Sequence, residues 1–175
     1  MLNNLTIAIS GKSGCGNTTV SKIVADRLNL KFINYTFRTM AEERGISFEA
    51  LRQMAEKSTA IDMELDKKQV YLADEGNCVL GSRLAIWMIA DADLKVYLSA
   101  SSEVRAGRIA NREKGSLEEK VKETEDRDQK DSARYKKIYA IDTNKYDFAD
   151  LIIDTDVNKV NEVVELILEA VESLQ

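Results

Sequence analysis

A glycine-rich stretch near the N-terminus constrains this chain more than any other feature. Ser10–Thr19 reads SGKSGCGNTT. Gly11, Gly16 and Thr18 stand where the phosphate-binding signature G-x-x-x-x-G-K-[ST] requires them, and Asn17 occupies the position of the signature lysine. The stretch therefore predicts a loop that wraps phosphate groups but lacks the usual ammonium.

The sequence on either side of the stretch has the pattern that such a loop needs. Residues 5–9 form a short apolar run with β-branched members, which is typical of a buried parallel strand. Apolar residues then recur at helical spacing from Val20 to Leu30. The alternative, a glycine-rich turn between strand and helix with no ligand, has less support from this order of elements.

In a loop of this kind, successive backbone N–H groups and the N-terminus of the following helix attract phosphate oxygens. The Thr18 hydroxyl is placed to bind Mg²⁺. Lys12, inside the loop, is one candidate for the cation that replaces the missing lysine. The residues predicted to hold ATP are Gly11, Lys12, Ser13, Gly14, Cys15, Gly16, Asn17, Thr18 and Thr19.

Composition narrows the chemistry. The chain has 175 residues, a net charge of −5 and no histidine, so histidine-based triads and histidine-ligated zinc are excluded. Cys15 and Cys78 do not make a disulfide framework or a metal site. Phosphoryl transfer needs mainly positioning and neutralisation of charge, which arginine, metal and backbone dipoles supply.

The net charge and the lengths of the apolar runs limit the kinds of partner that we expect. The acidic balance argues against general binding of nucleic acid, which usually shows a basic footprint. No apolar run approaches the length of a membrane span, and Met1–Asn4 lacks the basic start of a signal peptide. We therefore expect a cytoplasmic protein that acts on small molecules, and the size suits a monomer.

Strand and helix patterns alternate along the chain, which predicts an α/β fold of three layers with a central parallel sheet, in a single domain over residues 1–175. Strands are expected at 5–9, 31–35, 77–80, 94–98 and 151–154, and helices at 20–30, 36–44, 47–57, 62–74, 104–112, 117–139 and 157–174.

Ligands of such sheets bind beyond the carboxyl ends of the strands. The loop at Gly11 and the turns at 35–38 and 81–83 follow three of these ends, so they should meet at one rim. Arg38 and Arg83 lie in the two turns, where their guanidinium groups suit a phosphate.

Other charged residues support either a binding or a surface role. Arg105, Arg108, Arg112 and Arg127 could face a polyphosphate or simply be solvated on their helices. Asp131 and Arg134 are three residues apart and share a helix face, which suits ribose and phosphate or a surface ion pair. Asp62 could meet a base or hydroxyl, or stabilise a helix start.

An ordered set of segments resembles the cytidylate kinases, in particular the short form of archaea and some bacteria. The resemblance covers nearly the whole chain, and the set is more specific than any one of its members. The segments are Gly11–Thr19, Phe37-Arg38 with Ala41–Gly45, Ile61–Asp66, Gly76–Leu80 with Arg83–Ala85, Val104–Ala106 with Arg108–Ala110, Arg127-Asp128 with Asp131–Tyr135, and Ile138-Tyr139.

The resemblance implies transfer of the ATP γ-phosphate to CMP or dCMP, with Mg²⁺ and without a covalent intermediate. It implies a lid at about 112–120 and acceptor-binding helices within about 36–75. Lys12, Arg83 and Arg112 are then the candidate catalytic residues. The candidate acceptor-binding residues are Arg38, Asp62, Arg83, Arg127, Asp131 and Arg134.

Two positions depart from the family pattern. Asn17 replaces the loop lysine, and Gly81-Ser82 stands where an acidic residue followed by glycine is usual. Asp154, Asp62 or substrate phosphates are candidates to compensate for the missing carboxylate. Two other interpretations stay open, namely a P-loop kinase for a different small acceptor and a nucleotide-binding protein with little catalysis.

Overall fold

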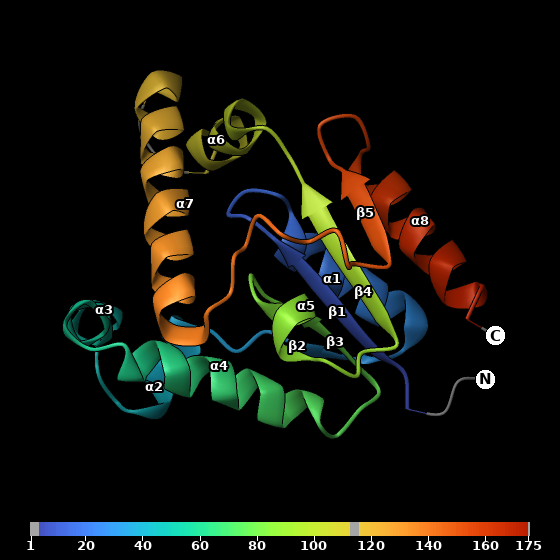
Figure 1. The fold of residues 1–175 in the computed structure, drawn as a ribbon, viewed down its shortest axis with the longest axis horizontal. Helices are drawn as coiled ribbons and strands as arrows, with labels where there is room; N and C mark the ends of the chain where they lie inside the picture. The colour runs from blue at the N-terminus through green and yellow to red at the C-terminus, as the bar shows by residue number, and fades with distance from the viewer. Residues whose placement is uncertain (1–3, 113–115, 175) are drawn as a thin grey trace.

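The computed structural model describes residues 4–112 and 116–174 (Figure 1). Its strands are β1 (Thr6–Gly11), β2 (Lys31–Ile33), β3 (Cys78–Gly81), β4 (Leu94–Ser99) and β5 (Leu151–Asp154). Its helices are α1 (Asn17–Leu28), α2 (Phe37–Glu43), α3 (Phe48–Lys57), α4 (Ala60–Ala73), α5 (Ala85–Met88), α6 (Ser102–Ala110), α7 (Leu117–Tyr139) and α8 (Val160–Glu172).

The strands form one parallel sheet in the order β2-β3-β1-β4-β5. The central strand β1 pairs with β3 on one side and β4 on the other, so that Ile9 stands in register with both Gly81 and Val96. The predicted α/β class and the positions of all five strands are confirmed. The two segments that follow β1 and β3 consequently begin side by side at one rim.

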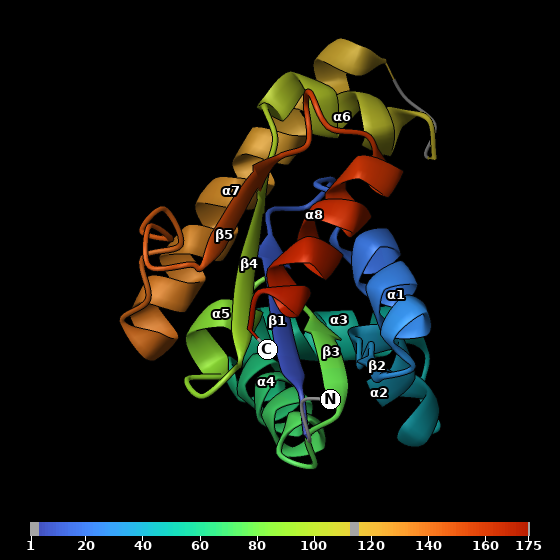
Figure 2. The same cartoon turned by 90° about the vertical axis from the view of Figure 1, so that its right-hand side faces the viewer.

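Two helical layers cover the sheet, as the two views together show (Figures 1 and 2). Alternation along β1 decides what each layer meets, because successive side chains of a strand point to opposite faces. Ile7 and Ile9 pack with Val24 of α1 and Ile167 of α8, whereas Ala8 belongs to the core on the other face, beside α5.

The short helix α5 was not expected from the sequence. It has four residues, Ala85–Met88, which is too short for a periodic pattern. The backbone N–H of Ile86 donates to Ser10 Oγ at 3.1 Å, so this helix is fixed directly to the strand that leads into the loop. Trp87 extends the packing, with its ring edge against Tyr97 of β4.

Helices α2, α3 and α4 form a separate small cluster beside the sheet. Tyr35, Met40, Leu51 and Ile61 make its buried core. The cluster lies under the lower end of α7 in Figure 1, which brings residues from the middle of the chain against residues 130–139. No helix in the described part of the chain is long and apolar enough to cross a membrane.

A buried arginine joins the glycine-rich loop to both α6 and α7. Arg105 of α6, whose side chain is only 4% exposed, pairs with Asp128 of α7 at 2.6 Å. Its guanidinium also donates to the backbone oxygen of Ser13 at 3.1 Å and to that of Ala100 at 3.3 Å. Arg105 was expected to face ligand or solvent, and that expectation was wrong, because the side chain is used inside the protein.

We predict that Arg105→Met destabilises the protein by about 3 kcal/mol, because it leaves the Asp128 carboxylate, whose side chain is only 15% exposed, without its main counter-charge. Urea unfolding measures this. The matched control is Arg27→Met, since Arg27 pairs with Glu165 in an exposed bridge and should cost no more than about 1 kcal/mol. Equal, small losses for the two variants would contradict the structural role of Arg105.

Candidate active site

A cavity of about 810 Å³ opens at the carboxyl ends of the strands, within the range that small-molecule sites occupy. It is lined by the glycine-rich loop, the segments after β2, β3 and β5, and residues of α1, α4, α6, α7 and α8. The residues from the loop and its helix are Gly11, Lys12, Ser13, Gly14, Cys15, Gly16, Asn17, Thr18, Thr19 and Val20.

Two backbone carbonyl groups of the loop are bonded to arginines of α6. Arg105 binds the oxygen of Ser13, and Arg108 donates to the oxygen of Gly14 at 3.1 Å. Gly14 has a φ of 86°, and a Cβ there would lie 2.9 Å from the Arg105 backbone oxygen, so only glycine fits. With these two carbonyls held on the α6 side, the loop is free to present N–H groups to the cavity.

The N-terminus of α1 is open toward the same cavity. The helix is preceded by Gly16, has no side-chain cap and has no acidic residue in its first turn. The first intrahelical bond runs from Val20 N to Gly16 O at 3.0 Å, so the N–H groups before it have no helical partner. Uncapped N–H groups together with the helix dipole make a favourable place for an anion.

The loop has one cation on its cavity side, Lys12, and that cation is tethered. Its Nζ lies 3.9 Å from a carboxylate oxygen of Asp128 and donates to Asn144 Oδ1 at 3.3 Å. Asn17, at the signature lysine position, accepts a hydrogen bond from Ser21 at 3.0 Å. The catalytic role of Lys12 stays a prediction, and it would require the ammonium to leave or share these partners.

The thiol of Cys15 lies inside the loop and is shielded from solvent. Cys15 is 2% exposed, and burial raises the pKa of its thiol to about 11, although Arg105 acts in the opposite direction. The thiol therefore stays protonated at neutral pH. Cys15 therefore serves as a small, buried residue of the loop.

One end of the cavity is formed by α6 and the segment after β5. Arg108 donates to the Thr155 hydroxyl at 3.0 Å and to the Thr155 backbone oxygen at 2.6 Å, which fixes the segment Thr155–Val160 beside the loop. Arg112 also lines this end. Its guanidinium makes no hydrogen bond or ion pair with any residue that the structure describes, so it is available for a ligand.

The opposite end carries a chain of alternating charges. Arg83 pairs with Asp131, Asp131 also accepts from Arg134 at 3.0 Å, and Arg134 Nε lies 3.4 Å from Asp62 Oδ1. Among the described residues, the buried Arg134 Nε atom has no hydrogen-bond partner. The predicted pairing of Asp131 with Arg134 on one helix face is confirmed, and the pair is part of a partly buried network rather than a surface bridge.

Two further groups at this end were not expected from the sequence. Gln69 donates from its buried amide to the Tyr35 backbone oxygen at 2.8 Å, which fixes the turn after β2. Tyr139 donates to Asp66 at 2.6 Å, and burial raises the pKa of the Asp66 carboxyl. Aromatic and amide residues on separate helices give no spacing signal that joins them, so only the fold reveals this cluster.

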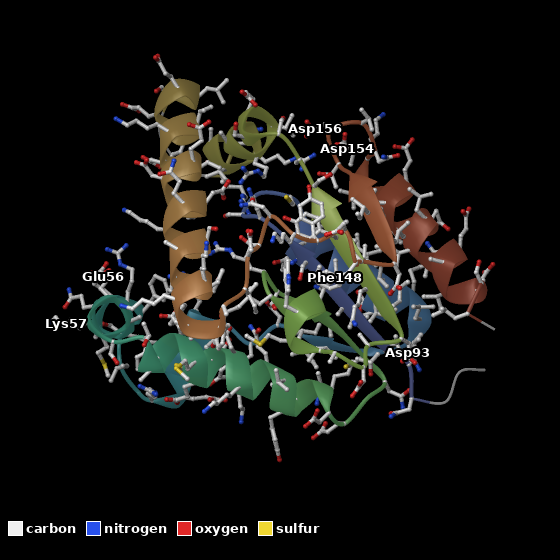
Figure 3. The ribbon with its side chains drawn as sticks, in the orientation of Figure 1. Glu56, Lys57, Asp93, Phe148, Asp154 and Asp156 are labelled. Atoms are coloured by element: carbon white, nitrogen blue, oxygen red, sulfur yellow. The ribbon has the colours of Figure 1, made fainter. Side chains whose placement is uncertain are left out.

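Some predicted residues lie outside the cavity lining. The Arg38 guanidinium is stacked 5.2 Å from the Phe48 ring centroid, and Arg127 donates to Ser13 Oγ at 3.3 Å. Asp131 does not line the cavity itself, but it pairs with Arg83 and Arg134, which do. Asp154, at the end of β5 (Figure 3), accepts a hydrogen bond from the backbone N–H of Asp156. It does not line the cavity, so it does not replace a carboxylate at Gly81.

The cavity fits Mg²⁺ only as a partner of bound phosphate. The described residues contain no group of three acidic, cysteine or histidine side chains able to form a cage. Thr18, exposed in the first turn of α1, supplies one hydroxyl at the cavity wall. Mg²⁺ usually combines one or two protein oxygens with phosphate oxygens and water, which matches this lining.

Burial, followed by the charge of Asp131, raises the pKa of the Asp62 carboxyl, while Arg134 lowers it. The folded protein therefore binds this proton more readily than the unfolded chain, whose Asp pKa is about 3.9. As the pH rises from this unfolded-chain pKa through the higher pKa of the folded protein, Asp62 ionises and the free energy of unfolding falls.

We predict that Asp62→Asn gains stability relative to the nucleotide-free parent protein as the pH rises above the ordinary Asp pKa of about 3.9, measured by urea unfolding. Asp147→Asn, which changes an exposed carboxylate, should run parallel to the parent protein. A difference that shrinks with rising pH would contradict the raised pKa.

Comparisons with known proteins agree with this geometry. The family model described as the cytidylate kinase-like family matches residues 6–157. A cytidylate kinase 2 of Borrelia garinii subsp. bavariensis is 47% identical over 96% of this chain and 97% of its own length. A cytidylate kinase of Pyrococcus horikoshii is 40% identical over 98% of this chain and 91% of its own.

Solved structures share the fold at low sequence identity. A shikimate kinase from Bacteroides thetaiotaomicron has a TM-score of 0.69 at 17% identity, covering 96% of this chain and 98% of the other. A deoxyadenosine kinase from M. mycoides with bound dCTP has a TM-score of 0.58 at 18% identity, covering 97% and 100%. These show a P-loop kinase fold, and the family match together with the full-length relatives shows that the chain belongs to the cytidylate kinase-like family.

Proposed function

We propose that the protein transfers the γ-phosphate of ATP to CMP or dCMP, giving CDP or dCDP. The observation that carries the proposal is the single cavity with a phosphate-binding loop in its middle and a different arginine-rich wall at each end. Relatives named cytidylate kinase, which align with nearly the whole chain, support a cytidine monophosphate as the acceptor.

In this proposal ATP occupies the loop and the end near α6. The triphosphate lies against the backbone N–H groups of the loop and the open N-terminus of α1. The adenine ring lies against Arg108 and the segment Thr155–Val160, which Arg108 holds in place. Thr18 and the phosphate oxygens hold Mg²⁺, which supplies neutralisation of phosphate charge when bound.

The acceptor nucleotide occupies the end near α4 and α7. Arg83 binds the acceptor phosphate, while Asp131 and Arg134 orient the nucleoside side. An acceptor phosphate oxygen attacks the γ-phosphorus, the bond from that phosphorus to the β–γ bridging oxygen breaks, and ADP leaves. Positioning and charge stabilisation account for most of such catalysis, so no covalent intermediate with the protein is needed.

Arg112 and Lys12 are the proposed cations for the transferring group. Arg112 lines the cavity without a partner in the described part of the chain, and an arginine at this position of the reaction contributes about 10³–10⁵ in rate. The proposed lid at about 112–120 includes residues 113–115, which lie outside the described residues. Closure there would exclude water that competes as an acceptor.

A second candidate is a nucleotide-binding protein with little catalysis. The observation in its favour is the pair of departures, Asn17 and Gly81, at positions that contact the triphosphate side of the cavity. A kinase for another small acceptor is the third candidate.

We further propose that the protein acts as a cytoplasmic monomer on free nucleotides, without nucleic-acid or membrane partners.

A panel of acceptors separates these candidates. Purified protein with Mg·ATP is offered CMP, dCMP, UMP, AMP, GMP and shikimate, and formation of ADP and of the phosphorylated product is followed. We expect rapid turnover with the cytidine monophosphates. Stabilisation by ATP against heat without turnover of any acceptor would favour the binding protein, and turnover of a different acceptor would favour the third candidate.

We predict that Arg83→Ala lowers kcat/KM for CMP by about 10²–10³, because one preorganised donor to the acceptor phosphate is lost. The KM for ATP should change less, since the guanidinium of Arg83 pairs with Asp131 of α7 and not with the glycine-rich loop. Arg52→Ala is the control, because Arg52 is 60% exposed and pairs only within α3. Equal kinetics in Arg83→Ala and Arg52→Ala would remove Arg83 from the site.

A further inference from the structure

Three residues meet at the position where the signature lysine is missing. Asn17 and Ser21 lie one turn apart on α1, and the Ser21 hydroxyl donates to Asn17 Oδ1 at 3.0 Å. Ser21 is fully buried, whereas Asn17 is half-buried and lines the cavity. The serine is thus a hidden partner of a residue that a ligand can reach.

Gly81, at the end of β3, leaves the room that this pair needs. A Cβ at Gly81 would lie 2.5 Å from Ser21 Oγ, 2.8 Å from Ser21 Cβ and 3.1 Å from Asn17 Oδ1. Contacts this short do not occur in folded proteins without displacement, so any side chain at this position would move the serine. The Ser21 hydroxyl can therefore keep its position only because Gly81 has no side chain.

The hydrogen bond leaves the two ends of the Asn17 carboxamide with different duties. Its oxygen is the acceptor for Ser21, and its Nδ2 has two N–H groups. Within the described residues Nδ2 makes no hydrogen bond. An amide that lines a phosphate-binding cavity with its oxygen already occupied offers donors, which phosphate oxygens accept.

We propose that Ser21 is a positioning residue, which holds the Asn17 carboxamide so that Nδ2 donates to the outer phosphate oxygens of a bound nucleoside triphosphate. Gly81 is the third member of the set, because it makes space for Ser21. This inference rests on the proposed use of the loop for ATP. The neutral amide lies at the position of the signature ammonium, whereas Lys12 lies elsewhere in the loop, beside Asp128 and Asn144.

A double-mutant cycle tests whether Ser21 acts through Asn17. The variants are Asn17→Ala, Ser21→Ala and the double variant, and the readouts are the Kd of a non-hydrolysable ATP analogue and the KM for ATP. We expect Ser21→Ala to weaken binding about three- to tenfold, as loss of one hydrogen bond does. The double variant should bind no more weakly than Asn17→Ala alone.

Val24→Ala is the matched control, because Val24 is fully buried on the same helix and makes no contact with Asn17 that would orient it. It should lower the melting temperature without changing analogue binding. Unchanged binding in Ser21→Ala, or penalties that add in the double variant, would overturn the inference. Turnover of CMP by the parent protein is scored separately, so failure of the proposed reaction is distinguishable from failure of this coupling.

Gly81 supplies an independent arm. Gly81→Ala should displace the Ser21 hydroxyl and weaken analogue binding as much as Ser21→Ala does. Adding Ser21→Gly to Gly81→Ala removes the two shortest contacts and leaves the one at 3.1 Å to Asn17 Oδ1, so the double variant should melt at a higher temperature than Gly81→Ala without regaining affinity. Full affinity in Gly81→Ala, at any melting temperature, would contradict the role assigned to the three residues.

Discussion

The bond network of Arg105 is the interaction on which the rest of the site depends. The buried guanidinium of Arg105, on α6, binds the Ser13 backbone oxygen and the Asp128 carboxylate at once. Without it, the glycine-rich loop would have several accessible conformations, because glycine restricts the backbone least. Arg105 therefore holds the Ser13 backbone oxygen while Arg108 holds that of Gly14, and these bonds restrict a flexible sequence to one shape.

Helix α7 connects this network to the acceptor end. Asp128 and Asp131 lie three residues apart on the helix and so share a face. Asp128 holds Arg105 and the loop, while Asp131 holds Arg83 and Arg134. The distance between the two proposed phosphate positions is consequently set by one rigid helix. In-line transfer needs this kind of control, because a small error in placement costs a large factor in rate.

Much of the fold was predictable from local patterns. The strand runs at 5–9 and 94–98 are apolar and short, and the loop between the first strand and helix has a recognisable spacing, so the sheet and its rim followed. The four-residue α5 was missed because it is too short for periodicity. Sequence spacing also placed Asp131 with Arg134, since both lie on one helix.

The tertiary roles of single side chains were not predictable in the same way. Arg105 and Arg108 have the pattern of a charged surface helix, and only the neighbouring loop makes their donors internal. Gly81 looked like a lost carboxylate, yet the space beside it is filled by Ser21, sixty residues earlier in the chain. Such pairings depend on strand register, which the sequence does not state. Asn17 and Gly81 are departures from a motif, and the structure joins them through one serine.

The most direct test of the central claim is a single-turnover experiment with protein in excess over ATP labelled at the γ-phosphate, in the presence of CMP and Mg²⁺. Direct transfer between the two ends of one cavity predicts that the label passes to CDP at the rate at which ATP disappears, with no label on the protein. Label that accumulates on the protein would contradict direct transfer. Release as inorganic phosphate would show that water, and not the nucleotide, is the acceptor.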